Sequence, residues 1–101
     1  MDLTVLPLPS LDELRRFVRE TLCTRDRLDP NQSRMRQGVI RRAGRPCGLY
    51  FQIEGPRLLR AYAVWAGDDH RILFYDSTGA RFADVRLSDE PDPRTLEARA
   101  A

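Results

Sequence analysis

The connections between five strand-like segments limit the folds open to this chain more than any other feature of the sequence. From residue 35 onward apolar and polar residues alternate, and each segment ends at a short turn rich in Gly, Pro, Asp or Ser. The predicted strands are residues 35–43, 47–54, 58–65, 71–76 and 81–87. Parallel neighbours would need crossover connections of about a dozen residues or more, and these turns are far shorter. The sequence therefore predicts an antiparallel β-meander.

One amphipathic helix is predicted ahead of the strands, at about residues 10–23. Ser10 and Glu13 have the spacing of a capping box, in which each side chain accepts a hydrogen bond from the other residue's backbone N–H. The apolar residues on one stripe of this helix are Leu11, Leu14, Phe17, Val18 and Leu22. Since a single helix covers a single face, the expected architecture is α+β, with one N-terminal amphipathic helix packed on one face of a five-stranded antiparallel β-meander.

The length of 101 residues fits one domain with short ends. We expect an extended N-terminal segment at residues 1–9, a single α+β domain at 10–87 and a flexible acidic, proline-containing tail at 88–101. This tail is predicted either to be disordered or to end in a frayed helical turn after Asp92 and Pro93.

Cysteine content and the apolar runs bear on the cellular compartment. Cys23 and Cys47 are too few for a disulfide framework, so we expect reduced thiols. Pro7 and Pro9 interrupt a first segment that lacks a basic leader, and no apolar run reaches the length of a membrane span. We therefore expect a cytoplasmic protein with no membrane association.

Alternation along the strands assigns their side chains to the two faces of the sheet. The predicted helix-facing set is Cys47, Leu49, Phe51, Ile53, Leu59, Ala61, Ala63, Trp65, Ala83, Val85 and Leu87. The predicted opposite set is Tyr50, Gln52, Arg60, Tyr62, Val64, Phe82, Asp84 and Arg86. Residues 71–75 are apolar on both sides, so alternation leaves their orientation open. The second face is more apolar than solvent alone favours, which predicts a binding surface unless the N-terminal segment or the C-terminal tail covers it.

Positive charge is concentrated in one part of the chain. The 17 basic residues, all arginine, exceed the 15 acids by two, which gives the net charge of +2. Residues 1–60 hold twelve arginines and seven acids, a balance of +5, and residues 61–101 hold five and eight, a balance of −3. No carboxylate lies between Asp29 and Glu54. That stretch contains Arg34, Arg36, Arg41, Arg42 and Arg45. Such an edge favours nucleic acid, an acidic protein surface or a second copy of the chain as its partner.

The residue groups that could support catalysis or metal binding are incomplete. Asp68, Asp69 and His70 are adjacent, but zinc sites draw three or four ligands mainly from His and Cys, so we expect a solvated turn here. Residues 76–79 differ by one inserted residue from the Asp-Ser/Thr-Gly motif of aspartic proteases and are typical of a hairpin turn. The sequence has neither a nucleophile elbow nor a Gly-rich phosphate loop. We therefore expect no enzyme activity, no metal and no cofactor.

These patterns favour binding through the open face of the sheet. We expect a small non-catalytic domain that acts in protein–protein interaction or homodimerisation through this face, and an edge strand could also accept an extended peptide. The alternative is RNA or single-stranded DNA binding through an arginine and aromatic surface. The candidate residues for either partner are Arg34, Arg36, Arg41, Arg42, Tyr50, Arg60, Tyr62, Phe82 and Arg86.

Overall fold

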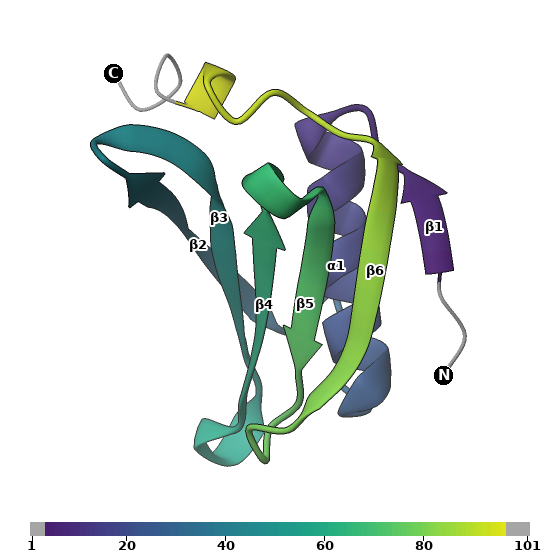
Figure 1. The fold of residues 1–101 in the computed structure, drawn as a ribbon. Coiled ribbons are helices and arrows are strands. Elements are labelled where there is room, and N and C mark those ends of the chain that lie inside the picture. The colour runs from purple at the N-terminus through teal and green to yellow at the C-terminus, as the bar shows by residue number, and fades with distance from the viewer. Residues whose placement is uncertain (1–3, 97–101) are drawn as a thin grey trace.

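A computed structural model of the chain describes residues 4–96 and confirms the α+β class. The elements in chain order are β1 (Thr4–Pro7), α1 (Leu11–Arg25), β2 (Arg34–Arg42), β3 (Arg45–Glu54), β4 (Arg60–Ala66), β5 (Arg71–Tyr75) and β6 (Arg81–Asp89) (Figure 1). A turn at Pro56–Leu58 connects β3 to β4, and a single turn of 3₁₀ helix at Gly67–Asp69 connects β4 to β5. Each of the five predicted strands is present, with ends that differ from the prediction by up to two residues.

Helix α1 begins at the predicted capping box and extends two residues past its predicted end. The Ser10 hydroxyl accepts a hydrogen bond from the Glu13 N–H at 3.1 Å, and the Glu13 carboxylate accepts one from the Ser10 N–H at 3.3 Å. Its buried side chains are Leu11, Leu14, Val18, Leu22 and Cys23. The helix lies against one face of the sheet, as Figure 1 shows.

The sheet has six strands in the order β1-β6-β5-β4-β3-β2, so the prediction of five antiparallel strands is wrong in two respects. Residues of the predicted extended N-terminal segment form β1, and β1 pairs in parallel with β6, with Thr4 opposite Val85 and Leu6 opposite Leu87. Short turns exclude parallel pairing only between consecutive strands. The whole domain separates β1 from β6 in sequence, so these two strands can pair in parallel.

The core lies between α1 and the helix-facing side of the meander, as alternation predicts for β3 and β4. Fully buried strand residues are Leu49, Phe51, Ile53, Ala61, Ala63, Trp65, Ile72 and Phe74. Burial of Ile72 and Phe74 fixes the orientation of β5 that the sequence left open, and Leu73 and Tyr75 therefore face the other side. Burying a large apolar side chain contributes about 1.5–3 kcal/mol, so this layer dominates the stability of the fold.

A β-bulge in β6 moves Phe82 to the helix side, so its predicted place on the open face is wrong. Tyr75 is opposite Arg81 and Phe74 is opposite Ala83, which leaves Phe82 as the extra residue. A bulge can point two successive side chains to the same face. The Phe82 ring accordingly lies 6.0 Å from the buried Phe74 ring, and both Phe82 and Ala83 pack against the core.

Two further residues of the predicted helix-facing set lie outside the regular alternation. The register of β2 and β3 shifts between Ile40 and Arg41, which leaves Cys47 half-buried with its thiol donating to the Ile40 carbonyl at 3.4 Å. Leu59 precedes β4, because Arg57 and Leu58 adopt the left-handed conformation and form a turn.

The chain beyond residue 87 continues the fold, whereas the prediction started a tail at Ser88. Strand β6 runs to Asp89, and Leu96 reaches the core with only 4% of its surface exposed. A Cβ added to Gly67 would lie 2.5 Å from Pro93 Cγ, so this segment packs closely on the end of the sheet. A turn follows Pro93, where the Leu96 N–H donates to the Pro93 carbonyl. Residues 97–101 of the predicted tail and 1–3 of the predicted N-terminal segment lie outside the described residues.

Candidate binding surface

The three tyrosines of the chain lie on the sheet face opposite α1, which we call the tyrosine face. Tyr62 in β4 is directly opposite Tyr75 in β5, and Tyr50 in β3 lies one diagonal step away, opposite Val64. Tyr50 is 44% exposed, Tyr62 is 39% exposed and Tyr75 is half-buried. Adjacent rings on neighbouring strands form one continuous surface, since diagonal cross-strand neighbours are within reach of aromatic side chains.

Tyr50 leans from β3 across the neighbouring strand, and a glycine makes room for it. Gly38 in β2 is opposite Tyr50, and a Cβ built on Gly38 would lie 2.3 Å from Tyr50 Cε1. The ring therefore occupies the space that any larger residue at position 38 would fill. The Tyr50 ring therefore extends the tyrosine face over β2, which is an edge strand of the sheet.

Arginines outnumber carboxylates on the tyrosine face. Away from the bulges, the register places five arginines and two carboxylates there, a balance of +3. They are Arg34, Arg36, Arg60, Arg71 and Arg86, with Glu54 and Asp84. Two ion pairs form among them, Arg36 Nε to Glu54 Oε1 at 3.4 Å and Arg71 Nη1 to Asp84 Oδ2 at 3.3 Å. The chain as a whole is only +2, so this face holds more than the entire excess of positive charge.

The structure brings five of the nine predicted binding residues together. Arg34 and Arg60 flank Glu54 in one cross-strand row, and Arg36 and Tyr62 flank Gln52 in the next. Tyr50 lies beside this group, opposite Gly38 and Val64. These five residues are Arg34, Arg36, Tyr50, Arg60 and Tyr62.

The remaining four predicted residues lie elsewhere. Arg42 Nη1 is 3.2 Å from Asp68 Oδ2 in the β4–β5 connection, and Arg41 Nη1 donates to the Gly44 carbonyl at 3.4 Å. Arg86 is opposite Arg71, near the β1 edge, and Phe82 is on the helix side. Tyr75 was missed because its strand is apolar on both sides. The pairing of 71–76 with 58–65 across a short turn was the signal that could have placed it.

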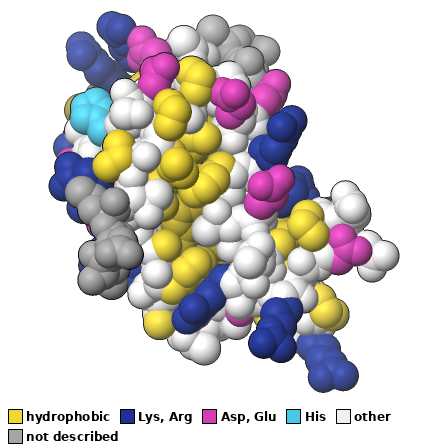
Figure 2. Space-filling model, turned by 90° about the vertical axis from the view of Figure 1, so that its right-hand side faces the viewer, with side chains coloured by type: hydrophobic (Ala, Val, Ile, Leu, Met, Phe, Trp, Pro, Cys, Tyr) yellow, Lys and Arg dark blue, Asp and Glu magenta, His cyan; other side chains and the backbone are white. Residues whose placement is uncertain are grey.

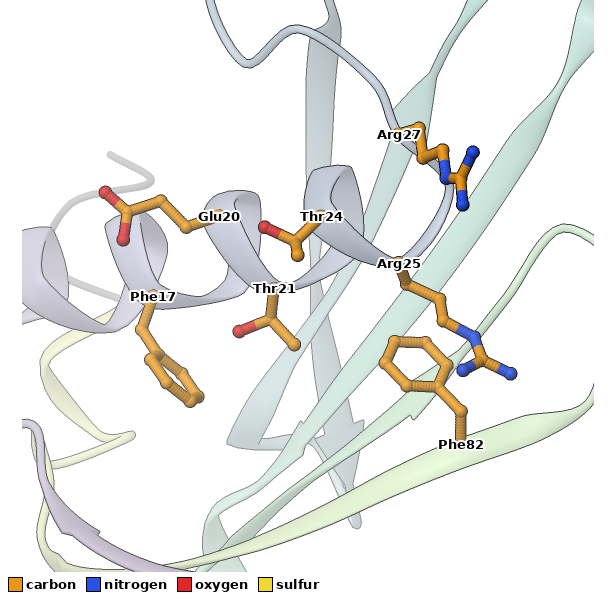
Figure 3. A pocket seen from close by; sticks show the side chains of 7 residues that line it. All are labelled: Phe17, Glu20, Thr21, Thr24, Arg25, Arg27 and Phe82. Carbon is orange, nitrogen blue, oxygen red and sulfur yellow. The ribbon is translucent and has the colours of Figure 1, made fainter.

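A groove of about 630 Å³ lies on the other side of the sheet, where Phe17 of α1 and Phe82 of β6 point into it (Figure 3). The Arg25 guanidinium lies 5.0 Å from the centre of the Phe82 ring and 3.4 Å from Asp76 Oδ2. Figure 2 shows that hydrophobic side chains form a band along the side of the molecule that carries β1 and β6. Phe17 and Phe82 are partly buried and both pack against the core, so the groove lies at the margin of that core.

Asp76 organises the β5–β6 hairpin turn, as the sequence indicates for residues 76–79. Its carboxylate accepts hydrogen bonds from the Thr78 hydroxyl at 2.6 Å, from the Thr78 N–H at 3.0 Å and from the Ala80 N–H at 3.3 Å. The Thr78 hydroxyl bond is the main reason that the pKa of Asp76 lies below its ordinary value of 3.8, and the two backbone bonds and Arg25 add to it. These partners occupy the carboxylate in a structural role.

We predict that Asp76 makes the stability of the protein depend on acidic pH. Because its pKa is lower in the folded chain, the carboxylate stabilises the fold above the ordinary pKa of 3.8, and this contribution is lost as the pH falls through the lowered folded pKa. In thermal unfolding, Asp76→Asn should therefore lower the Tm at pH 7 and have a smaller effect at pH ~2.5. A Tm difference that stays the same at both pH values would contradict this role.

The described residues give no support for a metal site or a membrane span. Residues 4–96 contain no group of three or more His, Cys, Asp or Glu side chains arranged to hold a metal ion. His70 instead has its Nδ1 2.6 Å from Glu90 Oε2, and Glu90 also accepts from Trp65 Nε1 at 2.9 Å. Burial raises the pKa of the Cys23 thiol, which disfavours the nucleophilic thiolate. No helix in this part of the chain is long and apolar enough to cross a bilayer.

Comparison of the chain with protein-family models, with curated proteins and with solved structures gives no match.

Proposed function

We propose that this chain is a non-catalytic binding domain of the cytoplasm whose tyrosine face takes a protein partner. The observation that carries the proposal is the gathering of all three tyrosines on the face that α1 leaves uncovered. Tyrosine is enriched in protein interfaces because it combines a large rigid contact area with a hydroxyl that forms hydrogen bonds. The other aromatic side chains of the sheet are buried in the core or pack against it.

The charge of the face favours a different, acidic protein over a second copy of the chain. In a twofold dimer through this face, each copy would contribute a balance of +3 to the interface. Like charges placed together in an interface cost binding energy, whereas an acidic surface would complement Arg34 and Arg60. Homodimerisation through the tyrosine face is therefore the less favoured form of protein interaction.

To test this proposal, we would compare the partner proteins retained by the wild type with those retained by Tyr62→Asp, a variant that places a negative charge at the centre of the face. Native mass of the purified protein, measured alongside, separates a second copy from a different partner. Retention of the same partners by Tyr62→Asp and by the wild type would contradict the proposal.

Single-stranded nucleic acid is the second candidate partner, because the same face offers stacking rings beside an excess of arginine. Bases stack on exposed aromatic rings, here Tyr50 and Tyr62, while arginines contact the phosphates. If this candidate holds, fluorescence anisotropy of labelled mixed-sequence RNA or DNA should report binding that weakens steeply with salt. Arg60→Ala should then lower the salt slope by about one unit, since one phosphate contact is lost. Absence of binding at low salt would remove this candidate.

A further inference from the structure

Strand β2 forms one edge of the sheet and β1 forms the other. Among the described strands β2 pairs only with β3, and its register is unbroken from Arg34 to Ile40. The other edge strand, β1, has four residues, and its register shifts at Pro7. An unpaired strand edge presents a row of backbone N–H and C=O groups that another strand can pair with. Of the two edge strands, β2 is therefore the longer and more regular one for another strand to pair with.

The charge of β2 selects which strand can pair with it. Residues 34–42 contain four arginines and no carboxylate. Pairing of β2 with the β2 of a second copy would place arginines of one strand beside arginines of the other, and like charges across a strand pair are destabilising. Charged edges protect sheets against such association. The same arginines would attract a strand that carries glutamate or aspartate.

The tyrosine face continues onto this edge at Gly38. Arg34, Arg36, Gly38 and Ile40 share the tyrosine face, by their pairing with Glu54, Gln52, Tyr50 and Gly48. The Tyr50 ring lies over Gly38, so it is within reach of a side chain placed just outside β2. On the helix side, Met35 and Val39 pack against the core. An added strand would therefore be recognised mainly through its side chains on the tyrosine face.

We propose that β2 binds an extended acidic segment of the partner protein as a seventh strand of the sheet. The segment pairs antiparallel with β2 and places an apolar or aromatic residue opposite Gly38, against Tyr50. Carboxylates two and four residues later lie opposite Arg36 and Arg34. Arginine has five N–H donors, so Arg36 can bind such a carboxylate while its Nε stays with Glu54. This inference rests on the proposed function, because it names the mode and chemistry of a partner for the same face.

The test uses a synthetic nine-residue peptide with Val, Phe, Glu and Glu at alternate positions and Thr between them. Fluorescence anisotropy should report binding of this peptide to the wild type, and no binding when Lys replaces both Glu. The double variant Arg34→Glu/Arg36→Glu should weaken binding of the Glu peptide by about fivefold or more and should bind the Lys peptide. The control Arg16→Glu/Arg81→Glu makes the same charge change at two exposed positions, one on α1 and one on β6, which is separated from β2 by three strands, and it should bind as the wild type does.

N-methylation of the peptide tests backbone pairing directly. In an added strand alternate N–H groups point toward β2, so methylating one alternate set should abolish binding and methylating the other set should leave it. Equal tolerance of both sets, or no binding of the Glu peptide, would overturn the inference. If the peptide fails while Tyr62→Asp still loses a cellular partner, the edge inference is wrong and the proposed function stands. Tighter binding of single-stranded RNA that the Arg34→Glu/Arg36→Glu variant abolishes would overturn both.

Discussion

Replacing Trp65 with alanine should lower the free energy of unfolding by about 3–5 kcal/mol, the range for removing a large buried aromatic side chain. Trp65 has no exposed surface and is the largest fully buried side chain in the core. Its Nε1 donates to Glu90 Oε1 at 2.9 Å, so the change also removes one of the contacts that hold the segment after β6 on the end of the sheet. Urea unfolding followed by circular dichroism measures the effect.

The Trp65→Phe variant separates packing from the hydrogen bond. Phenylalanine keeps much of the buried ring but has no donor for Glu90, whose side chain is only 12% exposed. We expect a cost of about 1–3 kcal/mol, smaller than for alanine, together with faster hydrogen exchange in residues 90–96. A loss below about 1 kcal/mol for Trp65→Ala would contradict the central place of Trp65 in the core.

Replacing Tyr62 with aspartate should weaken partner binding by at least 2 kcal/mol, about thirtyfold in Kd, the threshold for a contact at the centre of an interface. In the proposed complex this ring contacts the partner, so the change would remove that contact and place a carboxylate against an acidic surface. Tyr62 is 39% exposed and lies outside the core, so the folded state should remain. Affinity for the retained partner, measured by surface plasmon resonance, gives the size of the effect.

The matched control for Tyr62→Asp is Asn31→Asp, which changes the charge by the same amount on an exposed loop. Asn31 follows Pro30, whose carbonyl accepts from Arg19 of α1, so the loop lies on the helix side of the molecule. Asn31→Asp should bind as the wild type does. Equal losses of affinity in both variants would show that the effect comes from the change in net charge and not from the tyrosine face.

Local patterns in the sequence were sufficient for the helix and the meander. The capping box at Ser10 and Glu13 and the apolar stripe from Leu11 to Leu22 predicted α1, and alternation predicted the buried faces of β3 and β4. These signals arise within one element or between consecutive elements, where spacing and turn length determine geometry.

The features that the sequence did not reveal depend on pairing between distant segments and on local irregularities. Strand β1 is only four residues long and is stabilised by β6, whose Val85 is opposite Thr4 and lies 81 positions later, so its own alternation carried little information. The bulge at Phe82 adds one residue to the pairing with β5, and a strict period of two then assigns Phe82 to the wrong face. The same period could not orient Tyr75, because both sides of β5 are apolar. Five of the nine predicted binding residues were nevertheless brought together, because β2, β3 and β4 alternate regularly where these five lie.

Photocrosslinking from the tyrosine face tests the central claim most directly. A photoreactive benzoylphenylalanine would replace Tyr62 in one variant and Asn31 in another, in cells that make the protein. We predict a covalent adduct with a different polypeptide from position 62 that is absent from position 31 and that Tyr50→Asp removes. An adduct of twice the protein's mass would indicate a second copy, and an adduct with nucleic acid would indicate the second candidate. Equal yields from both positions, or no adduct from position 62, would contradict the assignment of this face as the binding surface.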